Sequence, residues 1–183
     1  MLEKVDLTKK ISKEEYKAKM PQMEIELGRL QRECRELKIP VMIVFEGFGA
    51  SGKGVQIGKL IQSMDPRGFQ VFPIKAETED ERMHPFLWRF WTKTPADGRI
   101  AIFDRSWYRQ VTIERFEKRT REKEIETAFH SIEAFEKQLT DGGTILVKLL
   151  LDIDQKEQKK RFEKLLEKKE TAWRVSQGDR ERN

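Results

Sequence analysis

The sequence contains very little cysteine and histidine, and this excludes two classes of cross-linked fold. Cys34 is the single cysteine among 183 residues, so the chain has no internal disulfide framework, and a lone thiol fits a reducing compartment. His84 and His130 lie far apart in the sequence and have no cysteine partners, which gives a zinc site no support. We therefore expect a cytoplasmic protein that depends on a packed core.

Long apolar runs are also missing. No run approaches the roughly 18–20 residues that span a bilayer, and the N-terminus is charged from its third residue, unlike a signal peptide. The 37 basic and 32 acidic residues leave a net charge of +5, which permits a polyanionic partner without demanding one. Because the basic clusters are not interleaved with aromatic residues, we do not expect nucleic acid as a partner, and because no run spans a bilayer we expect no membrane.

Apolar runs of strand length alternate with helical periodicities along the chain. We expect strands over residues 41–45, 69–74, 99–103 and 144–151. Helices are expected over residues 55–64, 125–139 and 155–169, and Thr78 with Glu81 predicts the start of another. This alternation predicts the α/β class: a mostly parallel sheet between two layers of helices, an α/β/α sandwich.

A capping box formed by Ser12 and Glu15 predicts a further helix at the N-terminus, which we expect Pro21 to interrupt. Its apolar residues recur in alternating steps of four and three: Tyr16, Met20, Met23, Leu27, Leu30, Cys34 and Leu37. This stripe can pack against the core of the same chain, or it can form a coiled-coil-like contact between subunits.

A glycine-rich loop follows the first strand and matches the first seven positions of the Walker A pattern, G-x-x-x-x-G-K. In this pattern glycines allow backbone amides to converge on an oxyanion, and the lysine adds a positive charge near the N-terminus of the next helix. We expect the phosphate-binding residues to be Gly47, Gly49, Ala50, Ser51, Gly52, Lys53 and Gly54. The alternative is an ordinary turn between a strand and a helix.

Gly54 occupies the position at which most such loops carry the Ser or Thr that binds Mg²⁺. Asp104 is the candidate metal ligand instead, because it follows the third strand, and α/β folds bind ligands at the carboxyl ends of parallel strands. Arg105 beside it can hold a phosphoryl group through its planar guanidinium. We predict catalytic roles for Lys53, Asp104 and Arg105, with Mg²⁺ as the cofactor.

With these segments identified, the chain resembles the polyphosphate kinase 2 family. The matching segments are Asp104-Arg105-Ser106-Trp107-Tyr108, Glu114-Arg115, Val44-Phe45-Glu46-Gly47, Gly52-Lys53-Gly54, Asp65-Pro66-Arg67-Gly68-Phe69, Ile74-Lys75-Ala76, residues 85–91 and Trp173-Arg174-Val175-Ser176. The resemblance implies a P-loop kinase fold similar to thymidylate kinase. It also implies a Mg²⁺-dependent phosphotransferase that moves a phosphoryl group between inorganic polyphosphate and a nucleotide, AMP or ADP. The resemblance leaves the base of this nucleotide open between adenine and guanine.

The resemblance also assigns further site residues. Lys75 and Arg89 would line the nucleotide or phosphate channel, and Arg161 would belong to a lid over the site. AMP-phosphorylating members, some built from two fused copies of the domain, are the most similar. We therefore expect residues 1–39 to form an N-terminal helical extension and residues 40–183 to form a P-loop kinase domain that is truncated at its C-terminus. We also expect this domain to contact another copy of itself, either in a homo-oligomer or as a second copy in the parent chain.

The chain departs from the family pattern at the phosphate loop and after the third strand. Gly49 stands where members carry an Asp that serves the metal, Val55 replaces a glycine, and Arg109-Gln110 replaces a small or polar residue followed by Arg. One alternative is therefore a catalytically degenerate copy with a binding, regulatory or oligomerisation role. Another is an ATP-dependent kinase for a nucleotide or small molecule, which shares the loop but does not explain residues 104–108.

Overall fold

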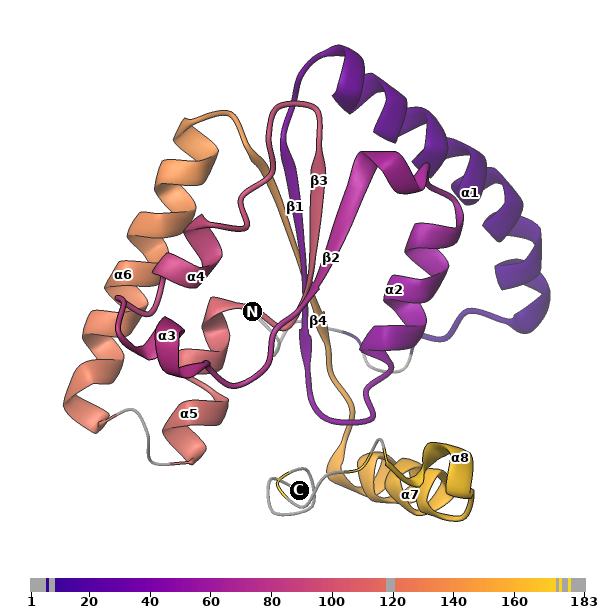
Figure 1. Cartoon of the computed structure of the whole chain (residues 1–183). Coiled ribbons are helices and arrows are strands. Elements are labelled where there is room, and N and C mark those ends of the chain that lie inside the picture. Colours follow the sequence, from indigo (N-terminus) through magenta and orange to yellow (C-terminus); the bar gives the residue numbers. More distant parts are fainter. Residues whose placement is uncertain (1–5, 7–8, 118–120, 174, 176–177, 179–183) are drawn as a thin grey trace.

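A parallel four-stranded sheet forms the centre of the computed structural model, which describes residues 6, 9–117, 121–173, 175 and 178 (Figure 1). The strands are β1 (Val41–Gly47), β2 (Phe69–Pro73), β3 (Ile100–Asp104) and β4 (Ile145–Leu151), in the spatial order β2-β3-β1-β4. All three pairings are parallel. The prediction of an α/β fold with a parallel sheet is confirmed, and the four expected strands agree with the observed ones to within two residues at each end.

The two central strands are buried on both faces, which explains their unbroken apolar sequences. Along β1, Met42 and Val44 enter one hydrophobic cluster, whereas Val41 and Phe45 enter the other. Side chains alternate in the same way along β3, where every residue from 100 to 103 is buried. The sheet therefore separates two hydrophobic cores, each covered by its own layer of helices.

Helices cover both faces of this sheet, as the prediction of an α/β/α sandwich requires (Figure 1). On one face lie α1 (Lys13–Glu36) and α2 (Lys53–Gln62). On the other lie α3 (Glu79–Arg82), α4 (Trp88–Trp91), α5 (Ile113–Phe116) and α6 (Glu122–Asp141). Beyond the carboxyl edge of the strands lie α7 (Gln155–Leu166) and α8 (Lys169–Ala172).

The N-terminal helix corrects one expectation, because Pro21 lies inside a continuous α1 of 24 residues. A proline inside a helix costs about 3 kcal/mol. This cost is offset at both ends of α1. Ser12 accepts a hydrogen bond from the Glu15 amide, as the predicted N-cap should. Near the other end, the Gln31 side chain donates to the Asp65 carbonyl at 2.9 Å and accepts from the Asp65 amide at 2.7 Å.

Only part of the apolar stripe on α1 packs against the domain. Cys34 belongs to the hydrophobic cluster around α2, whereas Met23, Leu30 and Leu37 remain exposed at intervals of seven residues. Packing against the chain's own core is thus shown for Cys34, and a contact between subunits stays a prediction for the three exposed residues. Among the described helices, none is long and apolar enough to cross a membrane.

Candidate phosphate-binding site

The loop between β1 and α2 requires glycine at two positions for different reasons. Gly47 has a φ of 139°, and a Cβ there would lie 2.2 Å from the Leu151 carbonyl oxygen. Gly52 has a φ of 103° and caps the N-terminus of α2, although a Cβ there would meet nothing within 4 Å. Gly47 is thus required by close packing and Gly52 by backbone conformation.

The loop presents hydrogen-bonding groups that an anion would satisfy. Lys53 is buried, and its Nζ donates to the carbonyls of Gly47 and Phe48 at 2.7 and 2.9 Å, so the ammonium lies inside the loop. The Ser51 hydroxyl is also buried and has no hydrogen-bond partner within the described part of the chain. A buried hydroxyl without a partner is rare and costly, which makes this loop suited to a bound oxyanion or its metal.

Strand pairing brings the predicted carboxylate to the same place. Because β3 is hydrogen-bonded beside β1, with Asp104 opposite Phe45, Asp104 emerges next to the loop. Asp104, Arg105 and residues 49–55 line one cavity of about 910 Å³, which we call the phosphate cavity. Arg105 has a φ of 67°, a conformation that is uncommon for a side-chain-bearing residue and is found at many functional sites.

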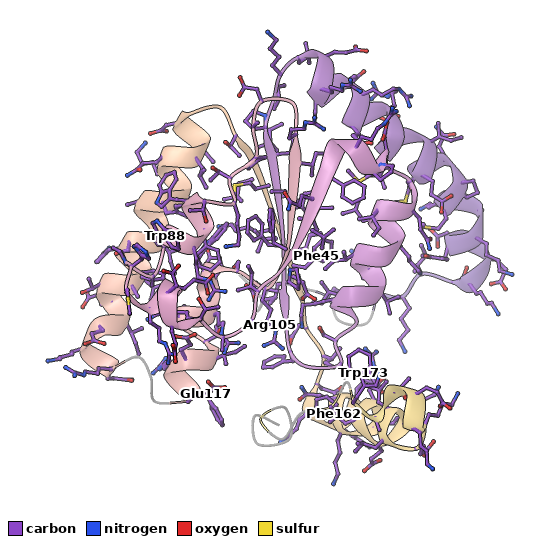
Figure 2. The ribbon with its side chains drawn as sticks, in the orientation of Figure 1. Phe45, Trp88, Arg105, Glu117, Phe162 and Trp173 are labelled. Carbon is purple, nitrogen blue, oxygen red and sulfur yellow. The ribbon has the colours of Figure 1, made fainter. Side chains whose placement is uncertain are left out.

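Helix α7 approaches the same loop from the other side. Arg161 donates to the Ala50 carbonyl at 3.1 Å, and Gln158 donates to the Gly49 carbonyl at 2.9 Å. These two side chains engage loop carbonyls. Arg161 lines the phosphate cavity together with Lys164 and Lys168. Figure 2 shows Phe162 and Trp173 of this region beyond the strand ends, near Arg105.

Two predicted residues lie outside the phosphate cavity. Lys75 is exposed just beyond β2, at the far edge of the sheet. Arg89 is buried, lies 3.3 Å from a carboxylate oxygen of Glu81 and donates to the Lys75 carbonyl. The Ile74 amide, next to Lys75, donates to the Asp104 carbonyl at 3.0 Å, so this segment lies beside the end of β3. Neither the Lys75 nor the Arg89 side chain lines the phosphate cavity, and their assigned roles stay predictions.

Glu46, which our sequence reasoning did not single out, stands between the loop and the end of β3. It accepts a hydrogen bond from the Ser106 hydroxyl at 2.6 Å. Burial raises the pKa of Glu46, while Ser106 and the nearby charges of Lys53 and Arg105 oppose that rise. Besides the match of Val44-Phe45-Glu46-Gly47 to the family, its sequence signal was an acidic residue at the end of an otherwise apolar strand, a position where charge is costly unless it has partners.

A second unpredicted residue, Glu136 on α6, anchors the segment that follows Asp104. Its carboxylate accepts hydrogen bonds from Trp107 Nε1 at 3.0 Å, from the Tyr108 hydroxyl at 2.8 Å and from Lys148 Nζ at 2.6 Å. Trp107 is completely buried. The cluster ties α6, β4 and the turn at Trp107–Gln110 into one unit.

Arg109, one of the departures from the family pattern, is used structurally. Its Nε donates to Glu114 at 3.1 Å, and both side chains are nearly buried. Arg109 lines neither the phosphate cavity nor the neighbouring cavity described below. At the position where the family resemblance led us to expect a small or polar residue, Arg109 thus forms a nearly buried ion pair.

The residues present fit a Mg²⁺ ion that is held largely by its substrate. The described residues contain no group of three His, Cys, Asp or Glu side chains that could enclose a metal. Mg²⁺ commonly binds one or two carboxylates together with phosphate oxygens and water, and Asp104 with the unpartnered Ser51 hydroxyl suits that arrangement. A Cβ at Gly54 would meet nothing within 4 Å, so there is room for the missing hydroxyl.

Comparison with known proteins agrees with this geometry. The polyphosphate kinase 2 family model matches residues 10–183. A polyphosphate:AMP phosphotransferase of Pseudomonas syringae pv. tomato is 40% identical over 163 residues, which are 89% of this chain and 33% of the relative. ADP-polyphosphate phosphotransferase 3 of Rhizobium meliloti is 31% identical over 164 residues, which are 90% of this chain and 58% of the relative.

The fold comparison gives the same result. The crystal structure of a polyphosphate kinase 2 from Arthrobacter aurescens TC1 superposes with a TM-score of 0.91 at 32% identity, covering all of this chain and 68% of that one. The predicted P-loop kinase fold is confirmed. This chain thus spans a third of the Pseudomonas relative and 58% of the Rhizobium one.

Proposed function

Because this chain belongs to the polyphosphate kinase 2 family, we propose that it transfers a phosphoryl group between inorganic polyphosphate and a nucleotide, AMP or ADP. The observation that carries this proposal is the convergence of the glycine-rich loop and Asp104 on one cavity. The names of the relatives favour polyphosphate over ATP as the phosphoryl donor.

The charge of the phosphate cavity supports a polyanionic substrate. Five cationic side chains and one carboxylate line it: Lys53, Arg105, Arg161, Lys164, Lys168 and Asp104. A polyphosphate chain carries about one negative charge on each phosphate, so several of these cations can be satisfied at once. Attraction between such charges is stronger in a partly enclosed cavity than in bulk water.

The proposal gives a role to each of the three proposed catalytic residues. Lys53 would exchange its two carbonyl partners for phosphoryl oxygens when substrate binds. Arg105 would neutralise charge on the transferred group, and Asp104 would hold Mg²⁺ against the phosphate chain. The metal would supply charge neutralisation at the reacting phosphoryl group. Catalysis of this kind rests on positioning and electrostatics, since phosphoryl transfer needs little covalent participation by the protein.

A second candidate function, a degenerate copy that binds substrate without turning it over, is favoured by one observation. Gly49 lines the phosphate cavity but supplies no carboxylate where members of the family carry Asp. Loss of one electrostatic stabiliser in an active site costs about 3 kcal/mol, or roughly a hundred- to thousand-fold in rate. The fold would survive this change, while turnover would be slow.

An activity assay separates the two candidates. The chain is incubated with polyphosphate, Mg²⁺ and AMP, and ADP is quantified, for the wild type, Lys53→Ala and the control Lys59→Ala. Lys59 lies on the same helix but outside the phosphate cavity. ADP formation that falls about a hundredfold or more in Lys53→Ala and persists in Lys59→Ala supports the transferase.

Binding resolves the case of an inactive chain. Polyphosphate affinity that depends on Lys53, without measurable ADP, supports the degenerate copy. If polyphosphate neither binds nor reacts, the proposed function is wrong. A contact with a second copy of the domain is part of the same proposal, and the exposed Met23, Leu30 and Leu37 on α1 support it.

A further inference from the structure

The segment that follows Asp104 is tied to the end of β1 by two neighbouring hydrogen bonds. The Arg105 amide donates to the Phe45 carbonyl at 2.9 Å, and the Ser106 hydroxyl donates to the Glu46 carboxylate at 2.6 Å. The first bond continues the pairing of β3 with β1, whereas the second is made by two side chains. Arg105 is therefore held by its own amide and by the side chain of the next residue.

Arg105 has a backbone conformation that needs such support. Its φ of 67° lies in the left-handed region, which is unfavourable for a residue that carries a Cβ. Its side chain makes no hydrogen bond or ion pair within the part of the chain that the structure describes. The direction of the guanidinium thus depends on the backbone of Arg105 and on the groups that hold this backbone.

Ser106 serves two partners from a fully buried position. Its hydroxyl accepts a hydrogen bond from the Tyr108 amide at 3.3 Å, which begins the turn at Trp107–Gln110, and it donates to Glu46. The bond to Glu46 has the length expected of a hydroxyl that donates to a carboxylate, and such bonds are about twice as strong as neutral ones. Because a capping serine needs only its acceptor oxygen, the bond to Glu46 is an additional anchor.

Glu46 also lies near the cations of the site. A second cavity of about 540 Å³, the neighbouring cavity, adjoins the phosphate cavity and is lined by both Glu46 and Arg105. Arg105 lines both cavities, so it stands at their common wall. Burial raises the pKa of Glu46, whereas the hydrogen bond from Ser106 and the positive charges of Lys53 and Arg105 lower it. The carboxylate thus provides a counter-charge near both cations.

We propose that Glu46 is a positioning residue: acting through Ser106, it holds Arg105 in its left-handed conformation and keeps the guanidinium at the phosphate cavity. This inference rests on the proposed function and adds to it a residue that acts through another. Two simpler roles compete with it. In an electrostatic role Glu46 only weakens the local positive charge, and in a structural role it only stabilises the fold.

Two variants of Glu46 with equal charge separate positioning from the electrostatic role. Glu46→Gln keeps a side-chain oxygen that can accept from Ser106, whereas Glu46→Ala keeps none, and both remove the same negative charge. An electrostatic role would make both variants bind inorganic polyphosphate more tightly than the wild type, and to the same extent. Positioning instead predicts that Glu46→Ala binds polyphosphate about tenfold more weakly than Glu46→Gln.

A double-mutant cycle with Arg105 separates positioning from the structural role. Ser106→Ala removes the donor of the bond to Glu46 and changes no charge. We expect it to weaken polyphosphate binding about tenfold when Arg105 is present, and less than about twofold in the Arg105→Ala background. The control Ser131→Ala removes a hydroxyl that donates to the Thr127 carbonyl within α6, and it should leave the affinity unchanged in both backgrounds.

Titration calorimetry with inorganic polyphosphate and Mg²⁺ measures these affinities, and circular dichroism checks the folding of each variant. Because all the measurements are of binding, they do not depend on turnover. If Ser106→Ala does not fold, the comparison of Glu46→Gln with Glu46→Ala decides alone.

Equal affinities of Glu46→Gln and Glu46→Ala would overturn the positioning role and leave the proposed function standing. An equal loss from Ser106→Ala in the two backgrounds would do the same. If the wild-type chain did not bind polyphosphate, the proposed function would fail, and the positioning role would fail with it.

Discussion

Replacing Glu136 should destabilise the protein strongly, because three donors converge on one carboxylate. In Glu136→Ala the buried Trp107 N–H loses its charged acceptor, a contact worth about 1.5–3 kcal/mol. The half-buried Tyr108 hydroxyl loses about 1 kcal/mol more. Lys148 is 45% exposed and can be hydrated instead, so its ion pair contributes at most about 1 kcal/mol. The expected cost is therefore about 2.5–5 kcal/mol.

Two further variants make this prediction specific. Glu136→Gln keeps an oxygen that can accept from Trp107 and Tyr108, so we expect it to cost only about 1 kcal/mol. Glu133→Ala removes an exposed carboxylate from the same helix, whose nearest ionic partner is His130, and should change stability by less than about 0.5 kcal/mol. Urea denaturation followed by circular dichroism measures all three. If Glu136→Ala were within 1 kcal/mol of Glu133→Ala, the reasoning from buried donors would be refuted.

Three other substitutions test separate parts of the site. Glu46→Gln should flatten the pH dependence of unfolding: burial raises the pKa of Glu46, so the wild type loses stability as pH rises from the ordinary carboxyl pKa of 4.5 through the raised value. Urea titrations across that pH range would show the difference, and an unchanged slope would contradict it. Gly54→Ser should stabilise α2 by about 0.5 kcal/mol, because a Cβ there meets nothing within 4 Å; a fall in Tm would count against this. Arg161→Ala should weaken polyphosphate binding about tenfold, or ~1.4 kcal/mol, while Lys160→Ala, outside the phosphate cavity, should not; equal losses in the two variants would reject a specific role for Arg161.

Sequence patterns predicted the fold well because its elements have local signals. Buried strands appear as continuous apolar runs. The apolar residues of α6 recur with a period of about 3.6, and this pattern ends at Gly142. The prediction for Pro21 was wrong because a local rule was applied without its tertiary context. A helix anchored by Gln31 to the turn at Asp65 tolerates a proline that a free helix would not.

The site was predictable where its residues form one continuous segment, follow a strand end or match a family motif. The phosphate loop is one continuous segment, and Asp104 could be placed by the rule that parallel strands end at a common edge. Glu46 and Ser106 are 60 residues apart, and Gln158 lies 109 residues from Gly49, so no spacing rule connects them. The positions of Lys75 and Arg89 depended on strand order, with β3 between β2 and β1.

A crystal structure of the chain with bound polyphosphate and AMP would test the central claim most directly. We predict phosphoryl oxygens within about 3 Å of the amides of residues 49–54 and of Lys53 Nζ, on the same side of the sheet as the Asp104 carboxylate. Polyphosphate bound elsewhere, with the phosphate loop making no contact to it, would contradict the claim.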